Sequence, residues 1–344
     1  MRVAFCTLLA ILCPLIAAAA TASDLKPSVS LDARGEYQHV QQADTTVHRQ
    51  SGFKGKLLSL FVTGELTPKF SYAYRQRLNG INRDHSFFDS TDWLWLRWNA
   101  SPNFSLLAGK WAVLTGTWEM DPPPIDCFQL AEFAYGFPCY AWGLVGIAST
   151  NSGHDKFMLQ VCQSPFRKTL EHATGRDIDT YAYNLIWQGN HGFWHPMWGV
   201  NLIECMPGRY ITYIGIGNRF LIGDRATIDL DFLNRSSSGH TYLFRDCSVM
   251  LQAQVRASRH VSAFLHGSYD VNRHSSTSRD LAITPGTEIK RLGAGLFLYP
   301  LADERLRIHA QYSYSWGTNT SPSAVLLDRQ HFINLGVTWK MKLL

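Results

Sequence analysis

Apolar and polar residues alternate along much of this chain, most clearly in its last third. In the segment RLRIHAQYSY, residues 305–314, every second position is Leu, Ile, Ala or Tyr, and Arg, His, Gln and Ser stand between them. A period of two is typical of β-strands, because successive side chains point to opposite faces of a sheet. Such runs recur at roughly 9–11 residues, the length that a tilted strand needs to cross a bilayer. The pattern predicts an all-β fold, a single antiparallel transmembrane β-barrel.

The alternation and the turn residues divide the chain into about sixteen strands. Fourteen and eighteen strands are the alternatives. We expect the strands near residues 29–38, 54–64, 69–77, 92–99, 104–111, 141–149, 156–163, 180–188, 197–205, 209–219, 225–233, 245–256, 260–270, 288–299, 304–314 and 331–341.

The connections between these strands alternate between short and long, as they do in outer-membrane barrels, where periplasmic turns are short and outer loops are long. Two connections fit less well, since 189–196 is long for a periplasmic turn and 206–208 is short for an outer loop. The pattern also changes parity between Ile211 and Ile216, which predicts a β-bulge there.

The first 22 residues have the pattern of a cleaved signal peptide. Arg2 precedes an apolar run, CTLLAILCPLIAAAA, and small residues at Ala20 and Ala22 mark an expected cleavage site before Ser23. Neither cysteine of this segment follows a small residue, so lipid anchoring is not expected. Residues 23–344 lack a linker-like composition shift, and we expect one outer-membrane barrel domain without a separate module.

Composition agrees with a barrel in contact with lipid. The chain is 46% hydrophobic and 17% charged, with 11 Trp, 14 Tyr and 19 Phe, and such rings are typical of the aromatic girdles at membrane interfaces. The formal net charge of +5 is too small to argue for nucleic-acid binding, and no basic cluster accompanies it. The expected surroundings are outer-membrane lipid and water.

Strand parity predicts which charged residues face the lumen, because a charge on the lipid face costs roughly 2–4 kcal/mol near the middle of the membrane. Fewer acidic than basic residues have the parity of the lumen face. The acidic residues are Asp32, Glu36, Asp229, Asp231 and Asp270. The basic excess favours an anion-attracting lumen; the alternative is that these charges only pair across neighbouring strands. The expected pore-lining basic residues are Arg34, Arg75, Arg77, Arg97, Arg225, Arg256, Arg291, Arg305, Arg307 and Lys340.

The connection 112–140 is unusually long and apolar. It contains Pro122-Pro123-Pro124, six aromatic residues and four carboxylates, and it directly follows Trp111, a seventh ring, at the end of the preceding strand. A segment this rich in rings is more stable packed inside the barrel than exposed outside it, so we expect it to fold inward and narrow the lumen. An extracellular cap over the barrel mouth is the alternative. The candidate constriction residues are Lys110, Glu119, Asp121, Asp126 and Glu132.

The same region resembles a known family. The run LLAGKW, then GTWEMDPPPIDCFQLAEF and a later QVCQSP at 160–165, is similar to the phosphate-selective porin O/P type family, in particular its shorter Bacteroidetes-like relatives. The resemblance implies an outer-membrane channel, usually a homotrimer, in which an inward loop forms the constriction and basic residues attract anions. Lys110, Glu119, Asp121 and Asp126 match the motif. The chain lacks the family's dense Lys and Arg ladder, so phosphate specificity is not carried over.

Five cysteines follow the signal segment, and all fall on the expected extracellular side. Joining Cys127 to Cys139 would close a loop of about a dozen residues, worth roughly 3 kcal/mol in the chain-entropy model. A disulfide between them is a candidate. Free thiols acting as small apolar fillers are the alternative.

Two weaker patterns bear on metal binding and catalysis. His191 and His195 lack a third ligand nearby, so an interfacial turn is favoured over a metal site. Ser262, His266 and Ser268 share an inward face with His309, but no hydrolase motif accompanies them. No catalytic residue, metal or cofactor is expected.

The function expected from these patterns is passive diffusion of small hydrophilic solutes, with a leaning toward anions, through an outer-membrane porin. A closed barrel with a surface-binding or adhesive role is the first alternative. A barrel hydrolase is the second.

Overall fold

The computed structural model describes residues 27–80, 87–237, 243–274 and 280–344. The expected signal peptide at 1–22 lies outside these residues. The described chain forms one antiparallel sheet of sixteen long strands and a two-residue strand, β2 (Thr45–Thr46). The long strands are β1 (Ser28–Gln42), β3 (Gly52–Thr67), β4 (Phe70–Arg77), β5 (Thr91–Ser101), β6 (Phe104–Ala112), β7 (Tyr140–Ser149), β8 (Asp155–Gln163), β9 (Tyr181–Gly189), β10 (Trp194–Met206), β11 (Arg209–Ile222), β12 (Ala226–Ser237), β13 (Asp246–Ser258), β14 (Val261–Asn272), β15 (Glu288–Leu298), β16 (Leu306–Thr318) and β17 (Gln330–Lys342).

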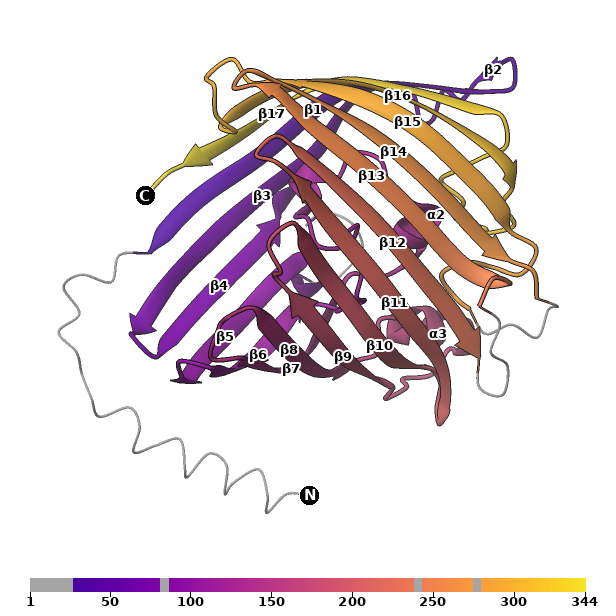
Figure 1. Cartoon of the computed structure of the whole chain (residues 1–344). Coiled ribbons are helices and arrows are strands. Elements are labelled where there is room, and N and C mark those ends of the chain that lie inside the picture. Colours follow the sequence, from indigo (N-terminus) through magenta and orange to yellow (C-terminus); the bar gives the residue numbers. More distant parts are fainter. Residues whose placement is uncertain (1–26, 81–86, 238–242, 275–279) are drawn as a thin grey trace.

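The sheet closes into a barrel, because β1 pairs with β3 on one side and with β17 on the other. The β1–β17 register runs without a shift from Ser30 opposite Lys342 to Gln42 opposite Gln330. Figure 1 shows the tilted strands enclosing the lumen, with α2 (Glu132–Gly136) inside it. The prediction of a single sixteen-stranded antiparallel barrel is confirmed.

The two ends of the barrel differ in their connections. Both described ends of the chain, before β1 and after β17, lie at the end where connections are short, as at 68–69, 102–103 and 259–260. The other end, called here the loop end, carries the connections 113–139, 164–180 and 319–329, and the second of these contains α3 (Arg167–Thr174). Among the described residues no helix is long and apolar enough to cross a membrane, a test that does not apply to strands.

Side-chain exposure follows the predicted parity. On β16, Ile308 and Tyr312 are exposed on the outer wall, whereas Arg307, His309 and Gln311 are buried on the lumen side. Other strands likewise expose large apolar residues outward, including Leu94, Leu144, Leu185, Val200, Leu265 and Leu296.

Three details near β10 and β11 differ from or sharpen the sequence prediction. The predicted bulge between Ile211 and Ile216 is wrong, because the β10–β11 register is continuous there and shifts only between Glu204 and Met206. The connection predicted as 189–196 shortens to 190–193, since β10 begins at Trp194. The connection predicted at 206–208 is indeed short, because only Pro207 and Gly208 lie between β10 and β11. Gly208 has a φ of 71°, a backbone conformation that favours glycine.

Substitutions on opposite faces of β13 and β14 test which face of the sheet contacts lipid. Leu265→Arg places a charge on the outer wall about midway along β14, and it should lower the free energy of unfolding in lipid vesicles by about 2–4 kcal/mol. Gln252→Arg is the matched control, because Gln252 lies at the same depth on the neighbouring strand, opposite His266, and lines the lumen. Denaturant titration of both variants checks this, and equal losses would contradict an outer wall in lipid.

Candidate constriction in the barrel lumen

The connection between β6 and β7, residues 113–139, lies inside the barrel and is called the plug here. Its first turn is held by side chains of the wall: Gln160 Oε1 accepts from Leu114 N at 2.9 Å, and Asn201 Nδ2 donates to Leu114 O at 2.6 Å. Gly116 then passes directly over the wall strands, where a Cβ atom would lie 2.6 Å from Gly199 N. Its φ of 74° also favours glycine. The backbone therefore turns into the lumen immediately after β6.

Two carboxylates of the wall anchor the plug backbone. Asp231 on β12 accepts from Trp118 N at 3.0 Å and Glu119 N at 2.8 Å. Asp270 on β14 accepts from Glu132 N at 2.8 Å and Phe133 N at 3.3 Å, at the first turn of α2. Hydrogen bonds to a charged acceptor each contribute about 1.5–3 kcal/mol. These two buried side chains therefore fix both halves of the plug.

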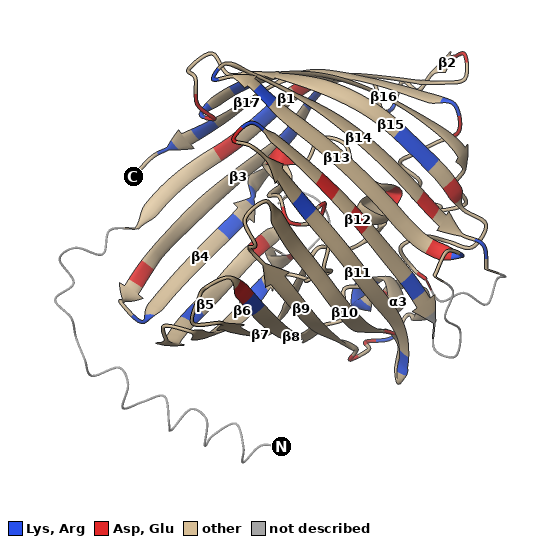
Figure 2. Cartoon of the chain, viewed as in Figure 1, with Lys and Arg blue, Asp and Glu red and all other residues tan. Residues whose placement is uncertain are grey.

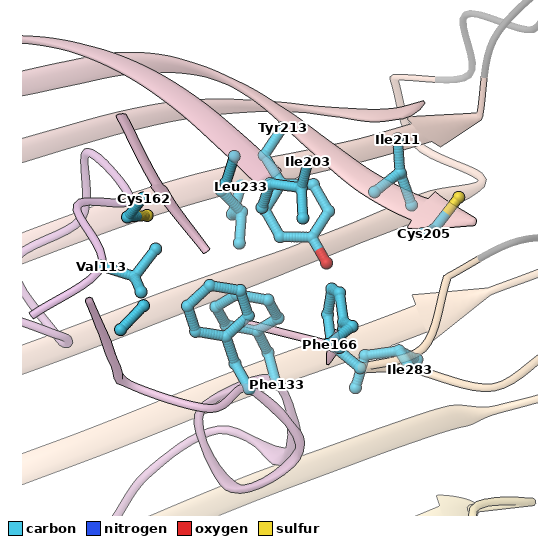
Figure 3. Packing of buried hydrophobic residues seen from close by; sticks show 14 of the residues in the cluster. Val113, Phe133, Cys162, Phe166, Ile203, Cys205, Ile211, Tyr213, Leu233 and Ile283 are labelled. Carbon is cyan, nitrogen blue, oxygen red and sulfur yellow. The ribbon is translucent and has the colours of Figure 1, made fainter. Parts of the chain in front are cut away.

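An apolar cluster fills the loop-end half of the lumen on the β8–β12 side. Phe133 and Phe137 of the plug stack with ring centroids 5.2 Å apart and pack against Tyr213 of β11 and Phe166 before α3. Figure 3 shows Phe133, Phe166 and Tyr213 within the cluster, which also contains Ile203, Leu233 and Ile283. This packing explains the sequence pattern of β11. Its inward Ile and Tyr side chains face the plug rather than water, so apolar residues occur on both faces of the strand and the alternation of apolar and polar positions is lost.

A second contact lies where the plug approaches β1 and β16. The Phe128 ring sits between two guanidinium groups, with Arg34 and Arg307 each 4.8 Å from its centroid. Arg34 donates to Cys127 O at 2.8 Å, and Arg307 donates to Ile125 O at 3.2 Å and to Asp126 at 2.7 Å. The combination of cation–π contact and hydrogen bonds holds Phe128 across the lumen.

The candidate carboxylates of the plug have different partners. Asp126 pairs with Arg307 and, at 3.2 Å, with Lys340. Glu119 instead accepts from Ala131 N and contacts His266 at 3.0 Å, and Glu132 accepts from Val325 N and Leu326 N in the connection 319–329. Asp121 remains exposed to the lumen.

Lys110 lies on β6, within the strand predicted at 104–111 and just before the plug. Its Nζ donates to Phe88 O at 2.6 Å in the connection between β4 and β5.

The predicted basic residues fall into three groups. In the first group, Arg34, Arg291 and Arg307 donate hydrogen bonds to backbone carbonyls of the plug, so these guanidinium groups are already engaged. Arg75 and Arg77 both pair with Asp92, at 3.0 and 2.9 Å, and the Arg75 side chain is also buried against Trp93 and Tyr140. The remaining residues, Arg97, Arg225, Arg256, Arg305 and Lys340, lie toward the short-turn end.

Within that last group, Arg225 and Arg305 correct the predicted strand bounds. Both lie in turns, because β12 begins at Ala226 and β16 at Leu306. Arg305 pairs with Asp303 at 2.8 Å, and this contact holds the pKa of the Asp303 carboxyl below its usual range. Figure 2 shows basic and acidic positions on adjacent strands of the wall, as for Arg219 on β11 and Asp229 on β12, which pair at 2.7 Å.

The candidate disulfide is absent, since Cys127 and Cys139 are both free thiols. Each Sγ lies near a backbone carbonyl instead, Cys127 near Pro122 O and Pro123 O and Cys139 near Phe137 O. Burial raises the pKa of Cys127 to about 12 and that of Cys139 to about 11. Both thiols therefore act as apolar fillers between the plug and the wall.

The sequence did not indicate a buried ionic cluster beside the plug, near the loop ends of β12 and β13. Arg235 is fully buried and pairs with Asp280 at 2.6 Å and with Asp246 at 3.1 Å. It also lies 5.4 Å from the Phe133 ring. The predicted strand ended at residue 233, so Arg235 was expected in a loop. The sequence feature that could have indicated its inward position is its spacing of two and four residues from two inward residues of the same strand, Asp231 and Asp229.

Several lumen cavities adjoin the plug, and three of them are large. The loop-side cavity, of about 650 Å³, lies between the plug and β1, β3 and β4, and its described lining includes six basic residues and two carboxylates. The basic turn-side cavity, of about 420 Å³, is lined by Arg305, Lys340 and Lys342 and by one carboxylate, Asp32. The acidic turn-side cavity, of about 340 Å³, has two arginines and three carboxylates in its described lining. Pro123, Pro124 and Ile125 of the plug separate the first two.

The side chains considered for metal binding and hydrolysis have other partners. His191 contacts Asp155 at 3.2 Å among Trp187 and Trp194, and His195 Nε2 lies 2.9 Å from Gly192 O. In the described part of the chain no group of three or more His, Cys, Asp or Glu could hold a metal ion.

His266 contacts Glu119, and His309 contacts Asn334 at 2.7 Å. Neither histidine is paired with Ser262 or Ser268 in the described structure.

A closed antiparallel barrel with a segment folded into its lumen defines the porin class of membrane proteins. The sequence model of the family described as phosphate-selective porin O and P matches residues 29–192, from β1 to the connection after β9. The match supports the family resemblance over these residues, which are slightly less than half of the chain. A search of curated proteins found no match.

Solved structures support the fold. An anion-selective porin from Comamonas acidovorans is similar with a TM-score of 0.63 and 10% identity, over 92% of this chain and all of that one. The outer membrane channel DcaP of Acinetobacter baumannii has a TM-score of 0.64 and 10% identity, over 95% of this chain and all of that one. The trimer form of OmpT from Vibrio cholerae has a TM-score of 0.59 and 11% identity, over 92% and 99% of the two chains. At such identities these structures show the shared fold.

The anchoring role of the two wall carboxylates can be tested by removing them. Replacing both carboxylates, Asp231→Ala with Asp270→Ala, removes the acceptors of four backbone hydrogen bonds, two at each anchor, and should weaken plug docking by about 3–6 kcal/mol per anchor. Limited proteolysis of the folded barrel should then cut within 113–139 far faster than in the parent protein. Asp303→Ala is the control, because that carboxylate contacts only the rim residue Arg305. An unchanged cleavage rate in the double variant would contradict the anchoring role.

Proposed function

We propose that this porin is a passive, water-filled diffusion channel of the outer membrane, with a preference for small anions. The observation that carries the proposal is the charge of the two cavities along β1, β3 and β17. The loop-side cavity and the basic turn-side cavity both have more basic than acidic residues in their described linings, and Pro123, Pro124 and Ile125 of the plug lie between them. A basic wall raises the local concentration of anions and disfavours cations.

The expected solute path follows this side of the barrel. On the opposite side the apolar cluster around Phe133 and Tyr213 fills the lumen near the loop end. The acidic turn-side cavity also has one carboxylate more than it has arginines in its described lining. Anions passing from the loop-side cavity would cross beside Pro123, Pro124 and Ile125 and leave past Arg305, Lys340 and Lys342.

The remaining parts of the proposal concern export and assembly. The segment 1–22 would direct the chain through the inner membrane and be removed, as its pattern predicts. The proposed assembly is a homotrimer. It is supported by the trimer form of OmpT, a protein with a similar fold. The adhesive barrel and the hydrolase are not favoured, because the family match points to a channel and the considered Ser and His side chains are unpaired with one another.

The constriction can be tested with Phe128→Ala. Phe128 lines both the loop-side cavity and the acidic turn-side cavity, so removing the ring that Arg34 and Arg307 contact should enlarge the opening between these two and raise the single-channel conductance in planar bilayers about twofold. Deleting residues 117–137 should raise it further. Phe104→Ala is the control, because Phe104 is exposed on the outer wall. Unchanged conductance in both plug variants would remove the plug from the conducting path.

Anion preference can be tested at the loop-side cavity. Lys54→Gln with Lys56→Gln removes two charges from its lining and should roughly halve the anion-to-cation permeability ratio under a KCl gradient. Lys290→Gln is the control, since Lys290 lies on the outer side of β15 between the inward residues Ile289 and Arg291. A reversal potential that stays constant in the double variant would count against the anion path.

A further inference from the structure

The loop-side cavity has two unlike walls. One wall is basic, with Arg49, Lys54 and Lys56 on or before β3 and Arg77 at the end of β4. The facing wall belongs to the plug and is apolar, with Met120, Pro122, Pro124, Ala134 and Tyr135. The volume of about 650 Å³ lies in the range typical of small-molecule sites.

We propose that this cavity binds amphipathic organic anions, small molecules with one carboxylate or sulfonate group on a single aromatic ring or a body of similar size. The proposal rests on the proposed function and names the class of solute that the channel would favour. It depends on which basic groups remain available and on what the apolar wall can recognise.

The lysines of the basic wall retain free donor capacity. Lys54 Nζ donates to Arg49 O at 3.3 Å, and a lysine ammonium has three donors. Lys56 Nζ lies 3.6 Å from Glu36, and 46% of its side chain is exposed. Arg34 and Arg291, in contrast, are engaged with plug carbonyls and are buried. An anionic group would therefore bind at Lys54 and Lys56.

The apolar wall discriminates between kinds of anion. A fully hydrated inorganic anion gains nothing from contact with Met120, Ala134 or the Tyr135 ring, whereas an apolar body gains free energy when these surfaces lose water. Tyr135 is 39% exposed although it lies inside the barrel, and its hydroxyl is oriented by Arg291 at 3.3 Å. An exposed ring held in this way offers a stacking surface for a second ring.

The test compares anions that share one head group. Benzenesulfonate and methanesulfonate are added to the full barrel in planar bilayers carrying a chloride current, with inorganic phosphate as a third probe. Benzenesulfonate should reduce the current at a concentration about tenfold lower than methanesulfonate does, because burial of one ring contributes on that scale. Phosphate should act no better than methanesulfonate.

Variants separate the contributions of the two walls. Tyr135→Ala should bring benzenesulfonate close to methanesulfonate, while Tyr181→Ala, on the outer wall of β9, should leave the difference intact. Lys54→Gln with Lys56→Gln should weaken both sulfonates alike. Equal effects of the two sulfonates on the parent barrel, or a stronger effect of phosphate, would overturn the proposal.

Titration calorimetry of the detergent-solubilised barrel keeps this proposal separate from the channel function. Benzenesulfonate should bind more tightly than methanesulfonate, and Tyr135→Ala should abolish the difference. If the barrel conducts anions but shows no such preference, only the proposal of amphipathic solutes fails. If it binds benzenesulfonate selectively but carries no current, the channel function fails and the binding site stands.

Discussion

The pairing of β1 with β17 is the interaction on which the rest of the structure depends. Lipid offers no hydrogen bonds, so a sheet that spans a membrane must leave no unpaired edge, and closure is the only solution for strands. The unbroken register from Ser30 opposite Lys342 to Gln42 opposite Gln330 joins the first strand to the last over the full height of the wall. Closure creates an interior, and that interior decides the chemistry of every inward side chain.

The plug is better described as a second core than as a loop. Its backbone turns inward at Gly116 and is anchored by carboxylates of the wall at Asp231 and Asp270. Its rings then pack with Tyr213 and Phe166 into a cluster that excludes water. Part of the lumen is thus packed like the interior of a soluble domain, and the largest remaining lumen cavity lies along β1, β3 and β4.

This arrangement changes the meaning of the basic residues. Arg34, Arg291 and Arg307 bind backbone oxygens of the plug and so serve mainly to position the constriction, whereas Arg75 is buried in the wall and paired with Asp92. The charges accessible to solute lie nearer the cavity surfaces, at Lys54, Lys56 and the turn-side Lys340 and Lys342. Charge on the inward face of a strand is therefore a poor measure of charge available in the pore.

Local patterns in the sequence determined the strands, their approximate bounds and the outward face, because alternation with a period of two reflects contact with lipid on one side of each strand. Composition also indicated that residues 112–140 belong inside. Only the tertiary structure decided which inward residues meet water and which meet the plug. Tyr213 disturbed the pattern because its ring contacts Phe133 and Phe137, and Ile211 belongs to the same buried cluster. Cys127 and Cys139 are free thiols although both line the loop-side cavity. Such contacts join residues far apart in the chain, and short-range periodicity carries no record of them.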